Sequence, residues 1–228
     1  MTKRRVMGMV IGVVVMAWAV VAIAASGGSG LAPDEALQKL MTGNKRFVQA
    51  QIKHRSLTIR EAREKLVQGQ KPYAIILSCS DSRVPPEIVF DETLGQLFVV
   101  RVAGNVVDPV VLGSIEYAVS HLGSSLIVVL GHEACGAVTA AMDATGKTEG
   151  NIAAIVDAVM PAVQDVRDTM EGRNRPDQVE AAIDQNISLQ TENLTRQSSL
   201  IRDYISQGKV RIVKGKYHLH HGEVTLLK

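Results

Sequence analysis

Three continuous apolar runs of strand length are the clearest pattern in the chain, at residues 73–78, 97–102 and 126–130. Runs that do not alternate with polar residues predict strands buried on both faces, as in a parallel sheet covered by helices. Between the second and third runs, residues 110–122 predict a helix long enough to connect two parallel strands. We therefore predict an α/β fold with a central, mostly parallel β-sheet flanked by helices.

Helical patterns surround these strands. A first helix is predicted to start at Pro33 and to be interrupted at Gly43, and a second is predicted from Thr58 to near Gly69. The small residues at 137–142 predict a helix packed against the sheet, and residues 151–206 predict further helices with a break at 172–177.

The C-terminus predicts a closing hairpin. Residues 210–213 and 217–227 have strand character, with a turn near His221 and Gly222. We interpret His218, His220 and His221 as solvated residues of this hairpin, with metal binding as the alternative.

The N-terminus has the pattern of a targeting segment. Lys3, Arg4 and Arg5 precede an uncharged apolar stretch at 6–25, so residues 1–25 are predicted to be a signal peptide. The alternative is an uncleaved N-terminal anchor, because about 20 apolar residues can span a bilayer. Residues 26–32 then form a flexible linker, and residues 33–228 a single domain. We expect an exported, most simply periplasmic, protein, or one anchored in the membrane and facing the periplasm.

Charge narrows the range of partners. The first 24 residues hold three of the 25 basic residues and none of the 23 acidic ones, so the remainder has a net charge of −1. A nearly neutral body without long basic runs has no electrostatic footprint for nucleic acid or anionic lipid. The expected substrate is a small molecule.

Three potential metal ligands follow two of the predicted strands. Cys79 follows the first run, and His132 and Cys135 follow the third. The carboxyl ends of parallel strands meet at one edge of the sheet, where ligands bind. Two thiolates and one imidazole are a ligand set that zinc prefers, with a fourth position left open in catalytic sites. The alternative is a disulfide between the two cysteines, which is common in exported proteins.

Asp81 and Arg83 lie beside Cys79 in the segment CSDSR. In an extended segment, two residues separated by one position project to the same side. They could form an ordinary surface ion pair of little energetic value. Next to a metal, Arg83 could instead hold the carboxylate away from the ion and orient it to accept a hydrogen bond from a bound water.

Together these segments resemble the β-class carbonic anhydrases. The matching stretches are CSDSRVPPE from residue 79, LFVVRVAGN at 97–105, SIEYAV at 114–119 and LIVVLGHEACGAV at 126–138. The similarity extends from about residue 34 to the end of the chain, and the N-terminal segment would make this an exported member.

The resemblance implies reversible hydration of carbon dioxide to bicarbonate and a proton. One Zn²⁺ per chain would be bound by Cys79, His132 and Cys135, and Asp81 and Arg83 would be a catalytic dyad that orients the zinc-bound hydroxide. A narrow apolar substrate pocket at a subunit interface is also implied. Its residues here would be Gln70, Phe98, Ala103, Tyr117 and Gly136.

The resemblance also implies a homodimer or tetramer in which the two N-terminal helices extend to a partner subunit. At low pH, Asp81 could leave Arg83 and become a fourth zinc ligand. Because two thiolates neutralise Zn²⁺, we expect activity to rise with alkaline pH.

Two alternative functions are a hydrolase of a carbon dioxide analogue such as carbon disulfide, and a non-catalytic zinc- or bicarbonate-binding protein.

Overall fold

The computed structural model describes residues 30–53 and 60–228. The predicted signal peptide, residues 26–29 of the predicted linker and the predicted helix start at Thr58 lie outside these ranges. Within the described ranges, no helix combines the length and the apolar character needed to cross a bilayer.

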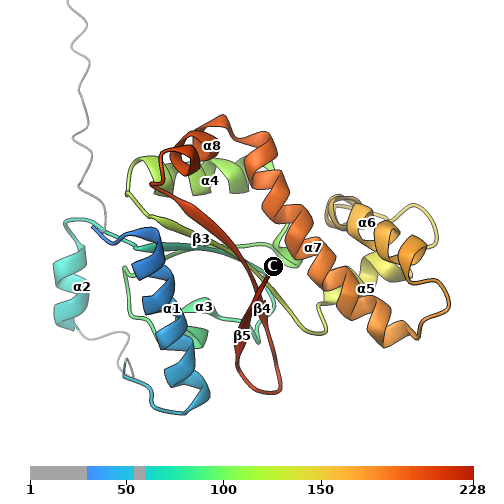
Figure 1. The fold of residues 1–228 in the computed structure, drawn as a ribbon, viewed down its shortest axis with the longest axis horizontal. Coiled ribbons are helices and arrows are strands. Elements are labelled where there is room, and N and C mark those ends of the chain that lie inside the picture. The colour runs from blue at the N-terminus through green and yellow to red at the C-terminus, as the bar shows by residue number, and fades with distance from the viewer. Residues whose placement is uncertain (1–29, 54–59) are drawn as a thin grey trace, which may run out of the picture.

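A five-stranded sheet forms the centre of the fold (Figure 1). Its strands are β1 (Ala74–Ser78), β2 (Leu97–Arg101), β3 (Leu126–His132), β4 (Arg211–Tyr217) and β5 (Val224–Leu227). The order in the sheet is β2-β1-β3-β4-β5, and every pairing is parallel except that of β4 with β5. The predicted mostly parallel sheet and the C-terminal hairpin are both confirmed.

The hairpin differs from the prediction in its boundaries. Tyr217 belongs to the first strand of the hairpin rather than to the second, because β4 continues in register beside β3 until Tyr217 pairs with His132. The phenol ring of Tyr217 is buried in the core at that point.

Helices cover both faces of the sheet. Successive strand residues point to opposite faces, so Ile75 and Leu77 join one core while Ala74 and Ile76 join the other. The first core lies under α4 (Pro109–Ser120), α5 (Gly136–Asp143), α6 (Ile152–Thr169), α7 (Arg175–Gln197) and α8 (Ser199–Ser206). The second lies under α1 (Pro33–Val48) and the short α3 (Pro86–Val89), while α2 (Arg60–Leu66) contains no buried residue.

Helix α1 runs through Gly43 without a break, so the predicted interruption is wrong. A Cβ atom at Gly43 would lie 1.9 Å from the carbonyl oxygen of Phe90. The glycine therefore allows close packing instead of ending the helix. The next residue, Asn44, is buried and donates from Nδ2 to the carbonyl oxygens of Val89 and Gly222, while its Oδ1 accepts from Val224 N.

Helix α7 lies directly on β3. A Cβ atom at Gly131 would lie 2.5 Å from two side-chain atoms of Ile187, so the helix occupies the space that a side chain at 131 would need. In Figure 1, α7 crosses the sheet between the α4 and α8 pair and the α5 and α6 pair. This contact fixes α7 against the residue immediately before His132.

The order of the strands reverses between β1 and β3. From β1 the chain continues to β2 on one side, while β3 lies on the other. Ligands in open α/β sheets bind at such a reversal. Cys79 directly follows β1, and His132 is the last residue of β3.

Candidate metal centre

The structure brings the three predicted metal ligands together. The ligand atoms of Cys79, His132 and Cys135 all lie within 4.8 Å of one another, and the three residues are buried. Tetrahedral zinc with sulfur and nitrogen ligands requires separations of about 3.5–4 Å between ligand atoms. In the described residues both cysteines are free thiols, so no disulfide joins them, contrary to the alternative prediction.

The imidazole of His132 is oriented for metal binding. Its Nδ1 lies 2.8 Å from the carbonyl oxygen of Glu133, and because a carbonyl only accepts, Nδ1 carries the proton. The other ring nitrogen, Nε2, is buried and has no hydrogen-bond partner. A buried polar atom without a partner is costly. A metal ion would give Nε2 the partner that it lacks, so the residues fit zinc.

The surroundings of the two thiols shift their pKa values and favour a thiolate at the metal site. A hydrogen bond from the Cys135 thiol, with further help from His132, lowers the pKa of Cys79 to about 4 against the opposing effect of burial. The same thiol contact, together with burial, raises the pKa of Cys135. The Gly104 N–H also lies 3.4 Å from Cys79 Sγ. A thiolate is therefore available to a metal at neutral pH.

Asp81 and Arg83 form a two-point ion pair beside these ligands. Arg83 Nε donates to Asp81 Oδ1 at 2.9 Å and Nη2 donates to Oδ2 at 2.7 Å. The segment forms a turn, and not the extended segment that we expected, because Asp81 Oδ1 also accepts the backbone N–H of Arg83 at 2.9 Å. These hydrogen bonds hold the pKa of Asp81 well below its usual range.

The carboxylate of Asp81 faces the metal ligands while it is paired. Its Oδ2 lies 3.9 Å from His132 Nε2. In this arrangement Arg83 binds both carboxylate oxygens. The arrangement in which Asp81 leaves Arg83 to become a fourth ligand stays a prediction.

Arg101 supports the site in a way that the sequence analysis did not predict. Its Nε donates to the Cys79 carbonyl oxygen at 3.1 Å and its Nη2 to the Asp81 carbonyl oxygen at 2.6 Å. Arg101 therefore fixes the backbone that carries both a metal ligand and the carboxylate. The signal in the sequence was a charged residue next to the end of the otherwise apolar run at 97–102.

The C-terminal hairpin supports the ligand loop through Glu133. The Glu133 Oε1 lies 2.7 Å from His218 Nδ1, and Oε2 accepts from Leu219 N at 2.9 Å. The second ring nitrogen of His218 lies 2.9 Å from Thr225 Oγ1. The interpretation of His218 as a solvated residue is therefore wrong, because both of its ring nitrogens have protein partners.

The residues predicted to bind substrate divide between opposite edges of the sheet. Ala103 begins a single 3₁₀ turn (Ala103–Asn105) beside Cys79, and Gly136 begins α5 directly after Cys135. Both belong to the metal edge.

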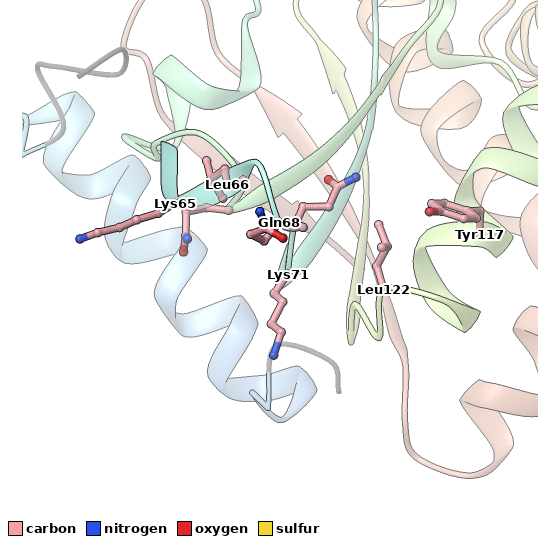
Figure 2. A pocket seen from close by; sticks show the side chains of 10 residues that line it. Lys65, Leu66, Gln68, Lys71, Tyr117 and Leu122 are labelled. Carbon is pink, nitrogen blue, oxygen red and sulfur yellow. The ribbon is translucent and has the colours of Figure 1, made fainter. Parts of the chain in front are cut away.

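The other three lie at the amino edge. Gln70 and Tyr117 line a cavity of about 670 Å³, and the ring of Phe98 lies 6.4 Å from that of Tyr117. Figure 2 shows Tyr117 and Leu122 on one side of this cavity. The whole of β1, five residues long and spanning roughly 16 Å, lies between Gln70 and Cys79. A single chain therefore does not bring Gln70, Phe98 and Tyr117 to the metal ligands.

Comparisons with known proteins agree with this geometry. The family model for carbonic anhydrase matches residues 74–224. A carbonic anhydrase from Mycolicibacterium smegmatis (strain ATCC 700084 / mc(2)155) is 44% identical over 197 residues, which cover 85% of this chain and 93% of the relative.

Solved structures give the same result. The β-carbonic anhydrase CcaA aligns with a TM-score of 0.69 at 26% identity, covering 84% of this chain and 95% of that one. A structure from work on two tetrameric β-carbonic anhydrases of Sordaria macrospora aligns with a TM-score of 0.68 at 22% identity, covering 84% and 96%, and supports the fold alone. By family match, by sequence identity and by the fold around its zinc ligands, this chain belongs to the β-carbonic anhydrase family.

Proposed function

We propose that this chain catalyses the reversible hydration of carbon dioxide to bicarbonate and a proton, with Asp81 and Arg83 as the catalytic dyad. The observation that carries the proposal is the buried Nε2 of His132, which has no hydrogen-bond partner and lies within 4.8 Å of two thiols and 3.9 Å from a carboxylate oxygen. A zinc ion fits the ligand atoms, and a carboxylate fixed beside them is suited to orienting a water molecule.

Each residue has a defined task in this proposal. Cys79, His132 and Cys135 hold zinc, which when bound supplies a Lewis acid that makes water nucleophilic near neutral pH. Asp81 accepts a hydrogen bond from the attacking water and so directs its lone pair toward carbon dioxide. Arg83 holds the carboxylate at two points and keeps it ionised.

We further propose that a second copy of the chain completes the substrate pocket. Ala103 and Gly136 would come from the chain that binds the metal, whereas Gln70, Phe98 and Tyr117 would come from its partner. The support is that Gln70 and Tyr117 line a cavity at the amino edge, that the ring of Phe98 lies beside that of Tyr117, and that Tyr117 leaves 47% of its surface exposed. The amide of Gln70 would donate a hydrogen bond to a substrate oxygen. A dimer is the smallest assembly that satisfies this, and a tetramer of such dimers satisfies it equally.

The N-terminal helices are proposed to reach the partner subunit. Helix α2 contains no buried residue within one chain, which supports a role in contacts outside it. Val67, directly after α2, is 77% exposed. An apolar side chain this exposed is consistent with an interface.

Export also remains a proposal. Its support is the basic cluster at residues 3–5 and the uncharged apolar stretch that follows at 6–25. Sequencing the N-terminus of the protein from a periplasmic fraction is expected to find a start near residue 26. A full-length chain confined to the cytoplasm would contradict export.

The test of the proposed reaction is stopped-flow hydration of carbon dioxide by the full chain, with zinc measured in the same sample. The wild-type protein is expected to contain one zinc per chain and to be active. Cys79→Ser is expected to lose most of its zinc and its activity together, because a hydroxyl is a much weaker zinc ligand than a thiolate. A zinc-loaded wild-type protein without hydration activity would contradict the proposal.

A further inference from the structure

The loop between the two neighbouring metal ligands contains a residue in an unusual conformation. Ala134, which lies between His132 and Cys135, has φ of +50°. For a residue with a side chain this left-handed conformation costs roughly 1–2 kcal/mol. Such a conformation persists only where neighbouring groups hold it.

Two side chains hold the backbone of Ala134, one on each side. Its N–H donates to Glu180 Oε1 at 3.1 Å, and its carbonyl oxygen accepts from Arg83 Nη2 at 3.3 Å. Arg83 therefore has two acceptors, the Asp81 carboxylate and the Ala134 carbonyl oxygen. The position of Ala134 affects both the metal ligands and the arginine of the proposed dyad.

Glu180 is itself fixed from two directions. It lies on α7, which is seated on β3 through the contact of Ile187 with Gly131. Its second oxygen, Oε2, is 2.8 Å from Lys216 Nζ, which comes from the neighbouring strand β4. Burial opposes the charge of Lys216, but its carboxylate partners raise its pKa above the ordinary value, so the lysine remains a cation.

Asp184 provides an internal comparison. It lies one turn after Glu180 on α7, its Oδ1 is also 2.8 Å from Lys216 Nζ, and its side chain is 45% exposed against 40% for Glu180. Only Glu180 contacts the ligand loop. The two carboxylates thus share one lysine but differ in their contact with Ala134.

We propose that Glu180 is a positioning residue for the metal centre. By fixing the Ala134 peptide, Glu180 holds the His132–Cys135 loop and also the carbonyl oxygen that is the second acceptor of Arg83. Lys216 keeps the Glu180 carboxylate in place by binding its other oxygen. The part that concerns Arg83 rests on the proposed dyad, whereas the part that concerns the ligand loop does not. Residues that support metal ligands in this way typically contribute 10- to 100-fold to metal affinity or activity.

The experiment compares Glu180→Ala with Asp184→Ala in the full chain loaded with zinc. The rate of zinc release to a coloured chelator is measured well below the melting temperature, and kcat and KM are measured for carbon dioxide hydration. Glu180→Ala is expected to release zinc about tenfold faster or more and to lower kcat with little change in KM. Asp184→Ala is expected to stay within about twofold of the wild type in both measurements, although it loses an ion pair with the same lysine.

Zinc release at equal rates from both variants would show that only the ion pairs of Lys216 matter, and would overturn the proposal. Release from Glu180→Ala at the wild-type rate would also overturn it. If Glu180→Ala does not fold, Glu180→Asp replaces it, because that variant keeps the charge for Lys216 but withdraws the oxygen from Ala134 by about 1.5 Å. Its expected result is again faster zinc release, and an unchanged rate refutes the role. Because zinc release does not depend on turnover, an inactive wild-type protein would refute the proposed reaction and leave this test intact.

Discussion

Replacement of Asp81 by asparagine is expected to lower kcat by about a hundredfold or more while leaving zinc bound. The Asp81 carboxylate accepts three hydrogen bonds from Arg83, two from the guanidinium and one from the backbone N–H. The side chain of asparagine has almost the same shape but offers only one oxygen. Its amide nitrogen would face another donor, either Arg83 Nη2 or the attacking water.

The magnitude follows from this loss of one acceptor. An asparagine at 81 can keep Arg83 in place or accept a hydrogen bond from the water, but it cannot do both. Groups that accept a proton or hydrogen bond in the transition state typically contribute 10²- to 10⁴-fold, and a hundredfold corresponds to about 2.7 kcal/mol. Zinc should remain because Asp81 Oδ2 lies 3.9 Å from His132 Nε2 and is held by Arg83.

The variant also has a small, predictable effect on stability. Arg83 lowers the folded-state pKa of Asp81 below its unfolded value of about 3.9. The pair therefore stabilises the fold above about pH 4, and this contribution is lost as the pH falls through the lower folded-state value. Arg83 is half exposed, so solvent screens the pair and the loss at neutral pH should be minor.

The assay is stopped-flow hydration of carbon dioxide with an indicator dye, with zinc content measured on the same protein. Asp157→Asn, an exposed exchange of the same kind on α6, is the control and should behave as the wild type. A zinc-loaded Asp81→Asn enzyme with kcat within threefold of the wild type would refute the reasoning. It would mean that the carboxylate does not act on the attacking water.

Three further predictions follow from the same structure. Asn44→Ala should lower the free energy of unfolding by about 3 kcal/mol, because three backbone groups each lose a buried hydrogen-bond partner worth about 1 kcal/mol. An unchanged free energy of unfolding in urea denaturation would contradict this. The kcat of the wild type should rise from pH 6 to pH 9. The lowered pKa of Asp81 keeps it ionised over this range, so zinc-loaded Asp81→Asn should keep a rise in its smaller kcat. Loss of the rise in the variant would identify Asp81 as the titrating group. After zinc removal, iodoacetamide at pH 6 should label Cys79 before Cys135, because the pKa of Cys79 is lowered to about 4 and that of Cys135 is raised. Bound zinc should protect both thiols from the reagent. Labelling of Cys135 first, measured by peptide mass spectrometry, would contradict the assignment of the thiolate to Cys79.

The sequence was sufficient for the features that depend on local pattern. Continuous apolar runs identified the first three strands, and ligand types at the ends of two of them identified the metal centre. The position of Gln70 before β1 and of Cys79 after it was also readable, so a pocket within one chain that contains both could have been excluded in advance.

The features that escaped prediction depend on contacts between distant segments. Gly43 has the pattern of a helix break, and only the approach of the Phe90 carbonyl oxygen explains why α1 continues. Glu180 lies 46 residues from Ala134, and nothing in its neighbourhood in the sequence distinguishes it from Asp184. The role of such residues is set by how α7 is seated on the sheet, which a single sequence does not reveal.

The close seating of α7 at Gly131 limits how this enzyme can be engineered for heat tolerance. Glycine-to-alanine exchanges are a common way to stabilise enzymes, because alanine restricts the unfolded chain. At Gly131 the added methyl carbon would lie 2.5 Å from Cγ1 and Cδ1 of Ile187, so this buried side chain, or the helix that carries it, would have to move. Because that helix carries Glu180, a substitution chosen for thermostability would weaken metal binding. A library of thermostable variants should therefore keep glycine at this position.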